Sequence, residues 1–285
     1  MSNQQLLPVN GVDLCVETLG TPADPAVLLI MGAAAPMDWW PDGFCERLAS
    51  EGHLFVIRYD HRDTGQSTSF EAGAPSYTSA DMTDDAIGVL DALGIDKAHL
   101  VGASMGGGIA QELAVDQFDR VLSLTLISTS PIGLGRDDLP PMSDELRQTF
   151  HDPVPQPDWS DRSAVVEYML KDLRPYHGSV TMDEAAWRSL VERIVDRTTN
   201  VAASMINHWI LEDGNASQAR TDQIAVPTLV LHGTEDPLFP YPHGQALADA
   251  IPGARLVPLE GVGHAELPPE VWDVAIAAIV GITST

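Results

Sequence analysis

Alternating strand and helix signals constrain the fold of this chain more than any other feature of its sequence. Residues 26–31 form a continuous apolar run that ends at Gly32, which is typical of a strand buried on both faces. Further strand signals lie at 12–18, 54–59, 98–101 and 121–127, and helical spacing of apolar residues lies at 82–93 and 105–115. Strands that alternate with helices predict βαβ units, and therefore an α/β fold with a mostly parallel central sheet flanked by helices.

A helical insertion is predicted to interrupt this alternation after Ser130. Strand signals are missing from residues 131–222, where helix-like stretches lie at 164–173, 183–196 and 201–211. Strand signals return at 226–232 and 254–258, and a last helix signal lies at 269–280. We therefore expect an α/β core made of residues 1–130 and 223–285, with a helical lid, or cap, inserted at 131–222.

The charge balance limits the partners of the chain. Its 285 residues include 15 Lys+Arg and 41 Asp+Glu, which gives a formal net charge of −26, while 44% of the residues are hydrophobic. A chain this apolar can bury a large core. A surface this acidic repels nucleic-acid phosphates and anionic lipid headgroups, so neither nucleic acid nor membrane is an expected partner. Neutral or cationic substrates are favoured over anionic ones.

The cysteines and the amino-terminal residues indicate a cytoplasmic protein. Cys15 and Cys45 are too few for a disulfide framework, and their apolar surroundings are typical of small core residues. Residues 1–10 lack the basic and apolar regions of a secretory signal. The longest apolar run, 26–31, is far shorter than the ~20 residues of a membrane span. Length and acidity are compatible with a monomer or a homodimer.

A nucleophile is predicted at Ser104. Residues 102–106 read Gly-Ala-Ser-Met-Gly and lie between a predicted strand and a predicted helix. A G-x-S-x-G sequence in this context forms a strained turn that holds the serine hydroxyl clear of the sheet. Glycines on either side of the serine let the strand and the helix approach without Cβ clashes. The alternative, a glycine-rich turn whose serine only caps a helix, is less favoured in this context.

The base and its orienting acid are expected downstream, in the order serine, acid, histidine. Asp236 follows the predicted strand at 226–232, so its side chain should lie at the same edge of the sheet as Ser104. His264 follows the last predicted strand in a glycine-containing loop that can place it over Ser104. Glu235 is the neighbouring alternative to Asp236, and its side chain should point away if Asp236 orients the histidine.

Two backbone amides are predicted to form an oxyanion hole. Met105 follows the nucleophile at a helix N-terminus, where the helix dipole favours negative charge. The second amide should come from the loop after the strand at 26–31, where small side chains let the backbone approach the substrate. Ala33 is the predicted donor, and Gly32 is its neighbouring alternative.

Aromatic residues supply the candidates for substrate binding. Apolar lid residues at helical spacing more often form lid core, and we expect about a third of those considered to line the pocket. They are Trp159, Tyr168, Met169, Tyr176, Trp187, Met205, His208 and Trp209. His208 and Trp209 are preferred because they precede the return to the core. Gly32 belongs to the loop that carries the predicted oxyanion hole, and Trp39 lies just beyond that loop. An aromatic, neutral pocket suits a bulky apolar ester.

Metal and cofactor sites are not predicted. None of the nine histidines has the spacing of a metal ligand set, and the nucleotide-binding glycine motifs are missing. Asp60, His61 and Arg62 follow a strand end, but a structural turn is the favoured interpretation there.

These motifs together resemble the α/β-hydrolase fold. The resemblance rests on residues 30–32, 58–67 and 261–264, together with Ser104 and Asp236. Within that fold the chain is similar to the aclacinomycin methylesterase group of actinomycete polyketide biosynthesis, which shares Met-Gly at 31–32 and Tyr-Asp-His-Arg-Asp-Thr-Gly at 59–65. The likeness covers roughly residues 10–130 and 225–270. It implies a Ser104–His264–Asp236 triad and a methyl ester of a bulky, polyketide-like acid as substrate.

Three classes of function are compatible with these residues. A serine esterase is the first, either a methylesterase or a general carboxylesterase of small esters. The second is a cofactor-free perhydrolase/haloperoxidase, or a lyase, that uses the same triad. A peroxide-dependent halogenation assay in carboxylate buffer would reveal the perhydrolase/haloperoxidase. A binding module without turnover is the third. Dehalogenases and epoxide hydrolases of this fold carry an aspartate at the elbow, so Ser104 argues against both.

Overall fold

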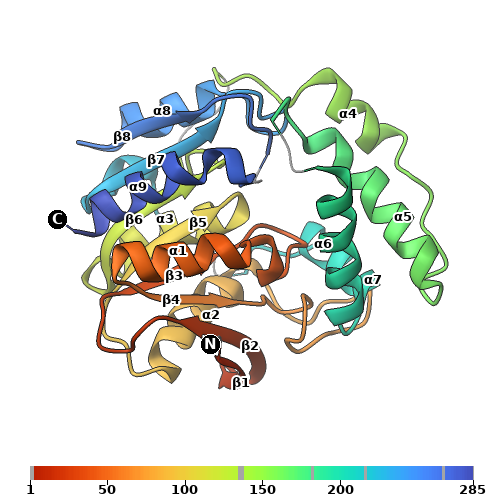
Figure 1. Cartoon of the computed structure of the whole chain (residues 1–285), viewed down its shortest axis with the longest axis horizontal. Coiled ribbons are helices and arrows are strands. Elements are labelled where there is room, and N and C mark those ends of the chain that lie inside the picture. Colours follow the sequence, from red (N-terminus) through yellow and green to blue (C-terminus); the bar gives the residue numbers. More distant parts are fainter. Residues whose placement is uncertain (1–2, 134–137, 181–182, 215–216, 265–266, 285) are drawn as a thin grey trace.

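The computed structural model describes residues 3–133, 138–180, 183–214, 217–264 and 267–284 (Figure 1). Its centre is one 8-stranded sheet with the strand order β1-β2-β4-β3-β5-β6-β7-β8. The strands are β1 (Asn3–Val9), β2 (Val12–Leu19), β3 (Ala26–Ile30), β4 (Phe55–Tyr59), β5 (Ala98–Ala103), β6 (Val121–Ile127), β7 (Thr228–Gly233) and β8 (Arg255–Leu259). Only the β1–β2 and β2–β4 pairs are antiparallel, so the predicted mostly parallel sheet is confirmed.

Helices cover both faces of the sheet (Figure 1). They are α1 (Asp42–Gly52), α2 (Ser79–Ala92), α3 (Met105–Asp116), α8 (Pro242–Ala250) and α9 (Trp272–Thr283). Helices α1 and α9 share one apolar cluster with the sheet, and α2, α3 and α8 share the other. Strands β3, β4, β5 and β7 are buried along their whole length between these two layers, which explains why most of their residues are apolar.

Four further helices stand at the carboxyl-end side of the sheet and fall within the predicted insertion (Figure 1). They are α4 (Asp144–His151), α5 (Arg162–Leu173), α6 (Glu184–Arg197) and α7 (Val201–Ile206). Helices α5 and α6 share a small apolar core of their own. The predicted helix signals match α5, α6 and α7, whereas the short and mostly polar α4 was not predicted. The remaining helices are short 3₁₀ turns at η1 (Met37–Trp39), η2 (Phe118–Arg120), η3 (Arg174–Tyr176), η4 (Asn207–Trp209), η5 (Thr221–Gln223) and η6 (Pro269–Val271). No helix in the described ranges combines the length and the apolarity that a membrane crossing requires.

The turn after β4 anchors these helices to the sheet. Arg197, the last residue of α6, donates to both carboxylate oxygens of Asp60 at 2.7 and 2.6 Å. Asn207 donates to the Asp63 carboxylate at 2.8 Å. Arg62 pairs with buried Asp85 at 2.6 Å, so the turn is also fixed to α2. The turn is therefore built from buried polar contacts, as its structural interpretation predicted.

Loss of Arg197 is expected to destabilise the protein more than loss of an exposed arginine. Burial opposes ionisation of Asp60 and, despite Arg197, raises the pKa of its carboxyl group. Arg197→Ala would remove the cationic partner of that buried group and leave only the amides of Met37 and Gln66 among the described residues, so the free energy of unfolding should fall by about 2–3 kcal/mol in urea denaturation. Arg162→Ala is the matched control, because Arg162 pairs with Asp196 on the exposed surface and its loss should change stability little. Equal effects of the two substitutions would contradict the anchoring role.

Candidate active site

Ser104 occupies a sharp turn between β5 and α3. Its φ of 52° and ψ of −119° are strained for a residue with a side chain. Added Cβ atoms would lie 2.3 Å from the Gly106 carbonyl oxygen at Gly102, and 2.2 Å from the Ile30 carbonyl oxygen at Gly106. Both glycines are therefore required sterically, and the turn has the geometry of a nucleophile elbow.

His264 connects Ser104 to Asp236. Its Nε2 lies 2.9 Å from Ser104 Oγ, and its Nδ1 lies 2.9 Å from Asp236 Oδ2. The His264 backbone amide donates to the Tyr176 carbonyl at 2.8 Å, which fixes the loop that carries the ring. The three side chains come from the segments after β5, β7 and β8, which end at one edge of the sheet.

Asp236 is held as an ionised, oriented acceptor. Its Oδ1 accepts the backbone amides of Leu238 and Phe239, each at 2.9 Å. Burial opposes ionisation, but His264, His232 and the Phe239 amide together outweigh it, so the pKa of Asp236 is lowered. An ionised Asp236 accepts from Nδ1–H, so Nε2 is left to accept the Ser104 hydroxyl proton.

Glu235 points away from this group. Its carboxylate accepts the Ser179 backbone amide at 2.7 Å and the Ser179 hydroxyl at 2.9 Å. The side chain is thus engaged with the segment after η3, on the surface. Asp236 is therefore the acid that faces His264, whereas Glu235 is held by Ser179.

The loop after β3 presents backbone amides beside Ser104. The amides of Ala33 and Met105 have no hydrogen-bond partner in the described part of the chain, whereas the Ala34 amide donates to His208 Nδ1 at 2.9 Å. Ala34 has a left-handed φ of 59°, which costs a residue with a side chain about 1 kcal/mol or more. The contact with His208 therefore helps to hold a strained loop in place.

His208 does not line the pocket, in contrast to its prediction as a substrate contact. Its ring is buried, Nδ1 accepts the Ala34 amide, and Nε2 donates to the Arg62 carbonyl at 2.8 Å. Burial lowers the pKa of His208, which favours the neutral ring that these two bonds require. Both ring nitrogens are hydrogen-bonded to backbone groups, so His208 stabilises the loop after β3 instead of contacting the pocket.

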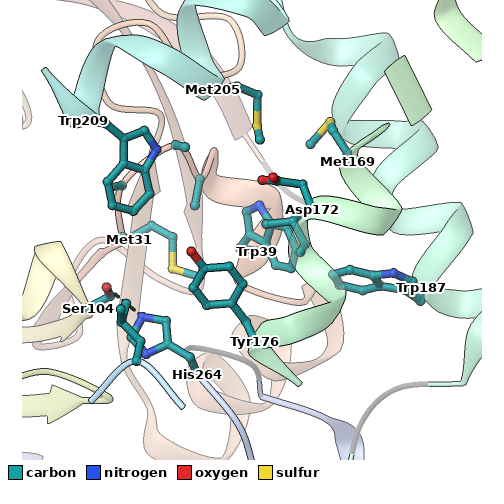
Figure 2. A pocket seen from close by; sticks show the side chains of 16 residues that line it. Met31, Trp39, Ser104, Met169, Asp172, Tyr176, Trp187, Met205, Trp209 and His264 are labelled. Carbon is teal, nitrogen blue, oxygen red and sulfur yellow. Dashed lines mark hydrogen bonds between the residues drawn. The ribbon is translucent and has the colours of Figure 1, made fainter. Parts of the chain in front are cut away.

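A largely apolar pocket opens above Ser104 and His264 (Figure 2). Gly32, Trp39 and Trp209 line the pocket as predicted. Of the eight lid residues considered, five line it, Trp209 included, which is more than the expected third. Those five are Met169, Tyr176, Trp187, Met205 and Trp209. Met31, Asp172, Leu173 and Leu238 also line the pocket and were not predicted. Sequence patterns do not show which face of a lid helix meets the core.

No cluster of metal ligands accompanies the pocket within the described ranges. No three or more histidine, cysteine, aspartate or glutamate side chains there lie in an arrangement that could hold a metal ion.

Gly32 leaves room beside the serine hydroxyl. An added Cβ there would lie 3.1 Å from Ser104 Cβ and 3.5 Å from Oγ. Gly32→Ala should therefore crowd the reacting carbonyl and lower kcat by about tenfold to a hundredfold. Gly108→Ala, on α3, is the control, because no heavy atom beyond its chain neighbours and the backbone of its own helix lies within 4 Å of an added Cβ there. Steady-state kinetics with a p-nitrophenyl ester measure both, and unchanged kcat in Gly32→Ala would contradict the close approach.

The fold and the comparisons define the class of this protein. A family model described as alpha/beta hydrolase fold matches residues 25–267, and the chain belongs to that family. The 2-hydroxy-6-oxo-6-phenylhexa-2,4-dienoate hydrolase from Rhodococcus sp. strain RHA1 shares the fold with a TM-score of 0.75 and 20% identity, over 100% of this chain and 99% of that one.

Two relatives indicate which kind of α/β-hydrolase the chain resembles. The chain is 34% identical to the rhodomycin D methylesterase of Streptomyces sp. (strain C5), over 98% of this chain and 97% of that protein. It is also 34% identical to the rhodomycin D methylesterase of Streptomyces peucetius, over 95% of each. The chain is thus an ester hydrolase of the α/β-hydrolase family with methylesterase relatives, and the resemblance inferred from its motifs is confirmed.

Proposed function

We propose that this protein hydrolyses the methyl ester of a bulky apolar carboxylic acid through a Ser104–His264–Asp236 triad. The hydrogen-bonded chain from Asp236 through His264 to Ser104 Oγ carries the proposal, because it supplies a nucleophile, its base and the orienting acid in one line.

In the acylation step, His264 Nε2 takes the Ser104 proton while Oγ attacks the ester carbonyl. Asp236 stabilises the imidazolium that forms and does not itself take the proton. The carbonyl oxygen becomes an oxyanion, and the unpartnered amides of Ala33 and Met105 would donate to it. Collapse of the intermediate breaks the bond to the alcohol oxygen, which leaves as methanol with the proton from His264.

In the deacylation step, water replaces the alcohol. His264 takes a proton from the water while the water attacks the acyl-enzyme carbonyl. The oxyanion of the second tetrahedral intermediate accepts hydrogen bonds from the same two amides. Its collapse returns the proton to Ser104 Oγ and releases the carboxylic acid. No cofactor or metal ion takes part in this sequence.

The pocket supports a bulky apolar acyl group. Trp39 enters from the loop after β3, while Met169, Tyr176 and Met205 enter from the helical insertion (Figure 2). In this proposal residues 131–222 act as the lid that recognises the acid. The methylesterase activity for which the two relatives are named supports methanol as the leaving alcohol.

The substrate class is tested by comparing kcat/KM for three esters. The methyl ester of a polycyclic aromatic acid should exceed methyl acetate, which has the same leaving group, by at least a hundredfold, or about 2.7 kcal/mol of transition-state stabilisation. The third ester, p-nitrophenyl acetate, reports the triad independently of acid recognition. Turnover of p-nitrophenyl acetate alone would contradict the methylesterase proposal and favour a general carboxylesterase. Peroxide-dependent halogenation in acetate buffer that exceeded ester hydrolysis would favour a perhydrolase.

A further inference from the structure

One carboxyl group stands among the apolar side chains of the pocket. Asp172 is the only residue with a carboxyl group among the described residues that line it. Its carboxylate points into the space between Met205 and Tyr176, across the pocket from Ser104 and His264 (Figure 2). Trp39 and Met169 lie beside it, so the acid faces the volume in which the acyl group of a substrate would lie.

This carboxylate has no partner of its own. Within the described ranges, the Asp172 side chain makes neither a hydrogen bond nor an ion pair. The arginines nearest in sequence, Arg162 and Arg174, are both paired with other acids. Burial raises the pKa of Asp172, which is the direction expected when a carboxylate loses water without gaining a donor.

The position of Asp172 along its helix adds to this cost. Asp172 is the penultimate residue of α5, where the helix macrodipole presents negative charge and disfavours an acid. Burial and the dipole therefore both oppose a charge at this position, and no described residue compensates for it. Side chains that cost stability in this way are characteristic of ligand sites.

We propose that Asp172 is a specificity-determining residue that binds an ammonium group on the acyl part of the substrate, remote from the ester. This inference rests on the proposed function, because it adds a basic amine to the bulky methyl ester. An ammonium group would give Asp172 the ion pair and the hydrogen bonds that it lacks. The rings of Trp39 and Tyr176 beside it would favour the same cation. The acidic surface, with a net charge of −26, would also attract it.

The test uses two methyl esters that differ only in charge. One is a polycyclic aromatic methyl ester that carries a primary amine, and the other is its N-acetyl derivative. The protein is expected to favour the amine by roughly tenfold or more in kcat/KM, mainly through KM. Asp172→Asn should reduce this preference, which is the ratio of the two kcat/KM values measured in the same variant, to about one.

Glu167→Gln is the matched control. It removes one negative charge from the same helix, but Glu167 is exposed and pairs with Arg188 outside the pocket. This variant should retain the preference for the amine, which separates a local contact from the diffuse field of an acidic surface. Equal selectivity in Asp172→Asn and Glu167→Gln would overturn the proposal.

Different experimental results would contradict this inference and the proposed function. Hydrolysis of both methyl esters without preference would overturn the role of Asp172 and leave the methylesterase proposal in place. If neither methyl ester is hydrolysed, the methylesterase proposal fails, and inhibition of p-nitrophenyl acetate hydrolysis by the amine decides the role of Asp172. Inhibition that is about tenfold weaker in Asp172→Asn supports the contact, and equal inhibition overturns it.

Discussion

Replacing Ser104 by alanine is expected to lower kcat/KM for carboxylic esters by about ten-thousandfold or more. The substitution removes the only atom that the proposal places in a covalent bond with the acyl group. The amides of Ala33 and Met105 remain in place, so a small residual acceleration over water is expected from the oxyanion hole. Thermal unfolding should change little, because the bond to His264 is the one hydrogen bond that the hydroxyl makes with described residues.

Ser128→Ala is a matched control for this result. Ser128 also follows a central parallel strand and also has a left-handed φ, of 46°, but its buried hydroxyl has no hydrogen-bond partner among the described residues. Removal of that hydroxyl should leave kcat/KM within about twofold. Residual activity above a few per cent in Ser104→Ala would show that another group is the nucleophile.

Replacing Asp236 by asparagine is expected to lower kcat by about ten-thousandfold. The Leu238 and Phe239 amides donate to Oδ1, so the oxygen of an asparagine would keep that position and its NH₂ group would face His264 Nδ1. Nδ1 would then become an acceptor, and the proton would move to Nε2, which faces Ser104. The histidine would be held in the tautomer that cannot act as base.

Glu235→Gln distinguishes this tautomer effect from a general loss of negative charge. Glu235 is adjacent in sequence but contacts Ser179, so its loss should cost less than tenfold in kcat. Steady-state kinetics of the two variants with the same ester provide the comparison. A larger effect for Glu235→Gln would contradict the assignment of Asp236.

The sequence predicted the parts of the site that depend on chain order and strand ends. Ser104, Asp236 and His264 each follow a predicted strand, and a parallel sheet brings such positions to one edge whatever the loops do. The amino-terminal hairpin was missed, although Asn10-Gly11 between β1 and β2 is a strong hairpin signal.

The parts that depend on the packing of the helical insertion could not be predicted. His208 and Trp209 are neighbours in η4, yet His208 is buried behind the loop after β3 while Trp209 lines the pocket. Asp172 is one of many acids in the chain, and nothing in the pattern of α5 shows that its side chain faces Ser104. Such assignments require the orientation of each helix, which local periodicity does not provide.

The central claim, that Ser104 carries the acyl group during ester hydrolysis, is tested most directly by mass spectrometry of the acid-quenched enzyme. With p-nitrophenyl acetate the leaving group departs readily, so the acyl-enzyme should accumulate during turnover. We predict one acetyl group on the peptide that contains Ser104, formed as fast as the initial release of p-nitrophenol and absent from Ser104→Ala. Turnover with this peptide unmodified at every quench time, or acetylation at another residue, would contradict the account.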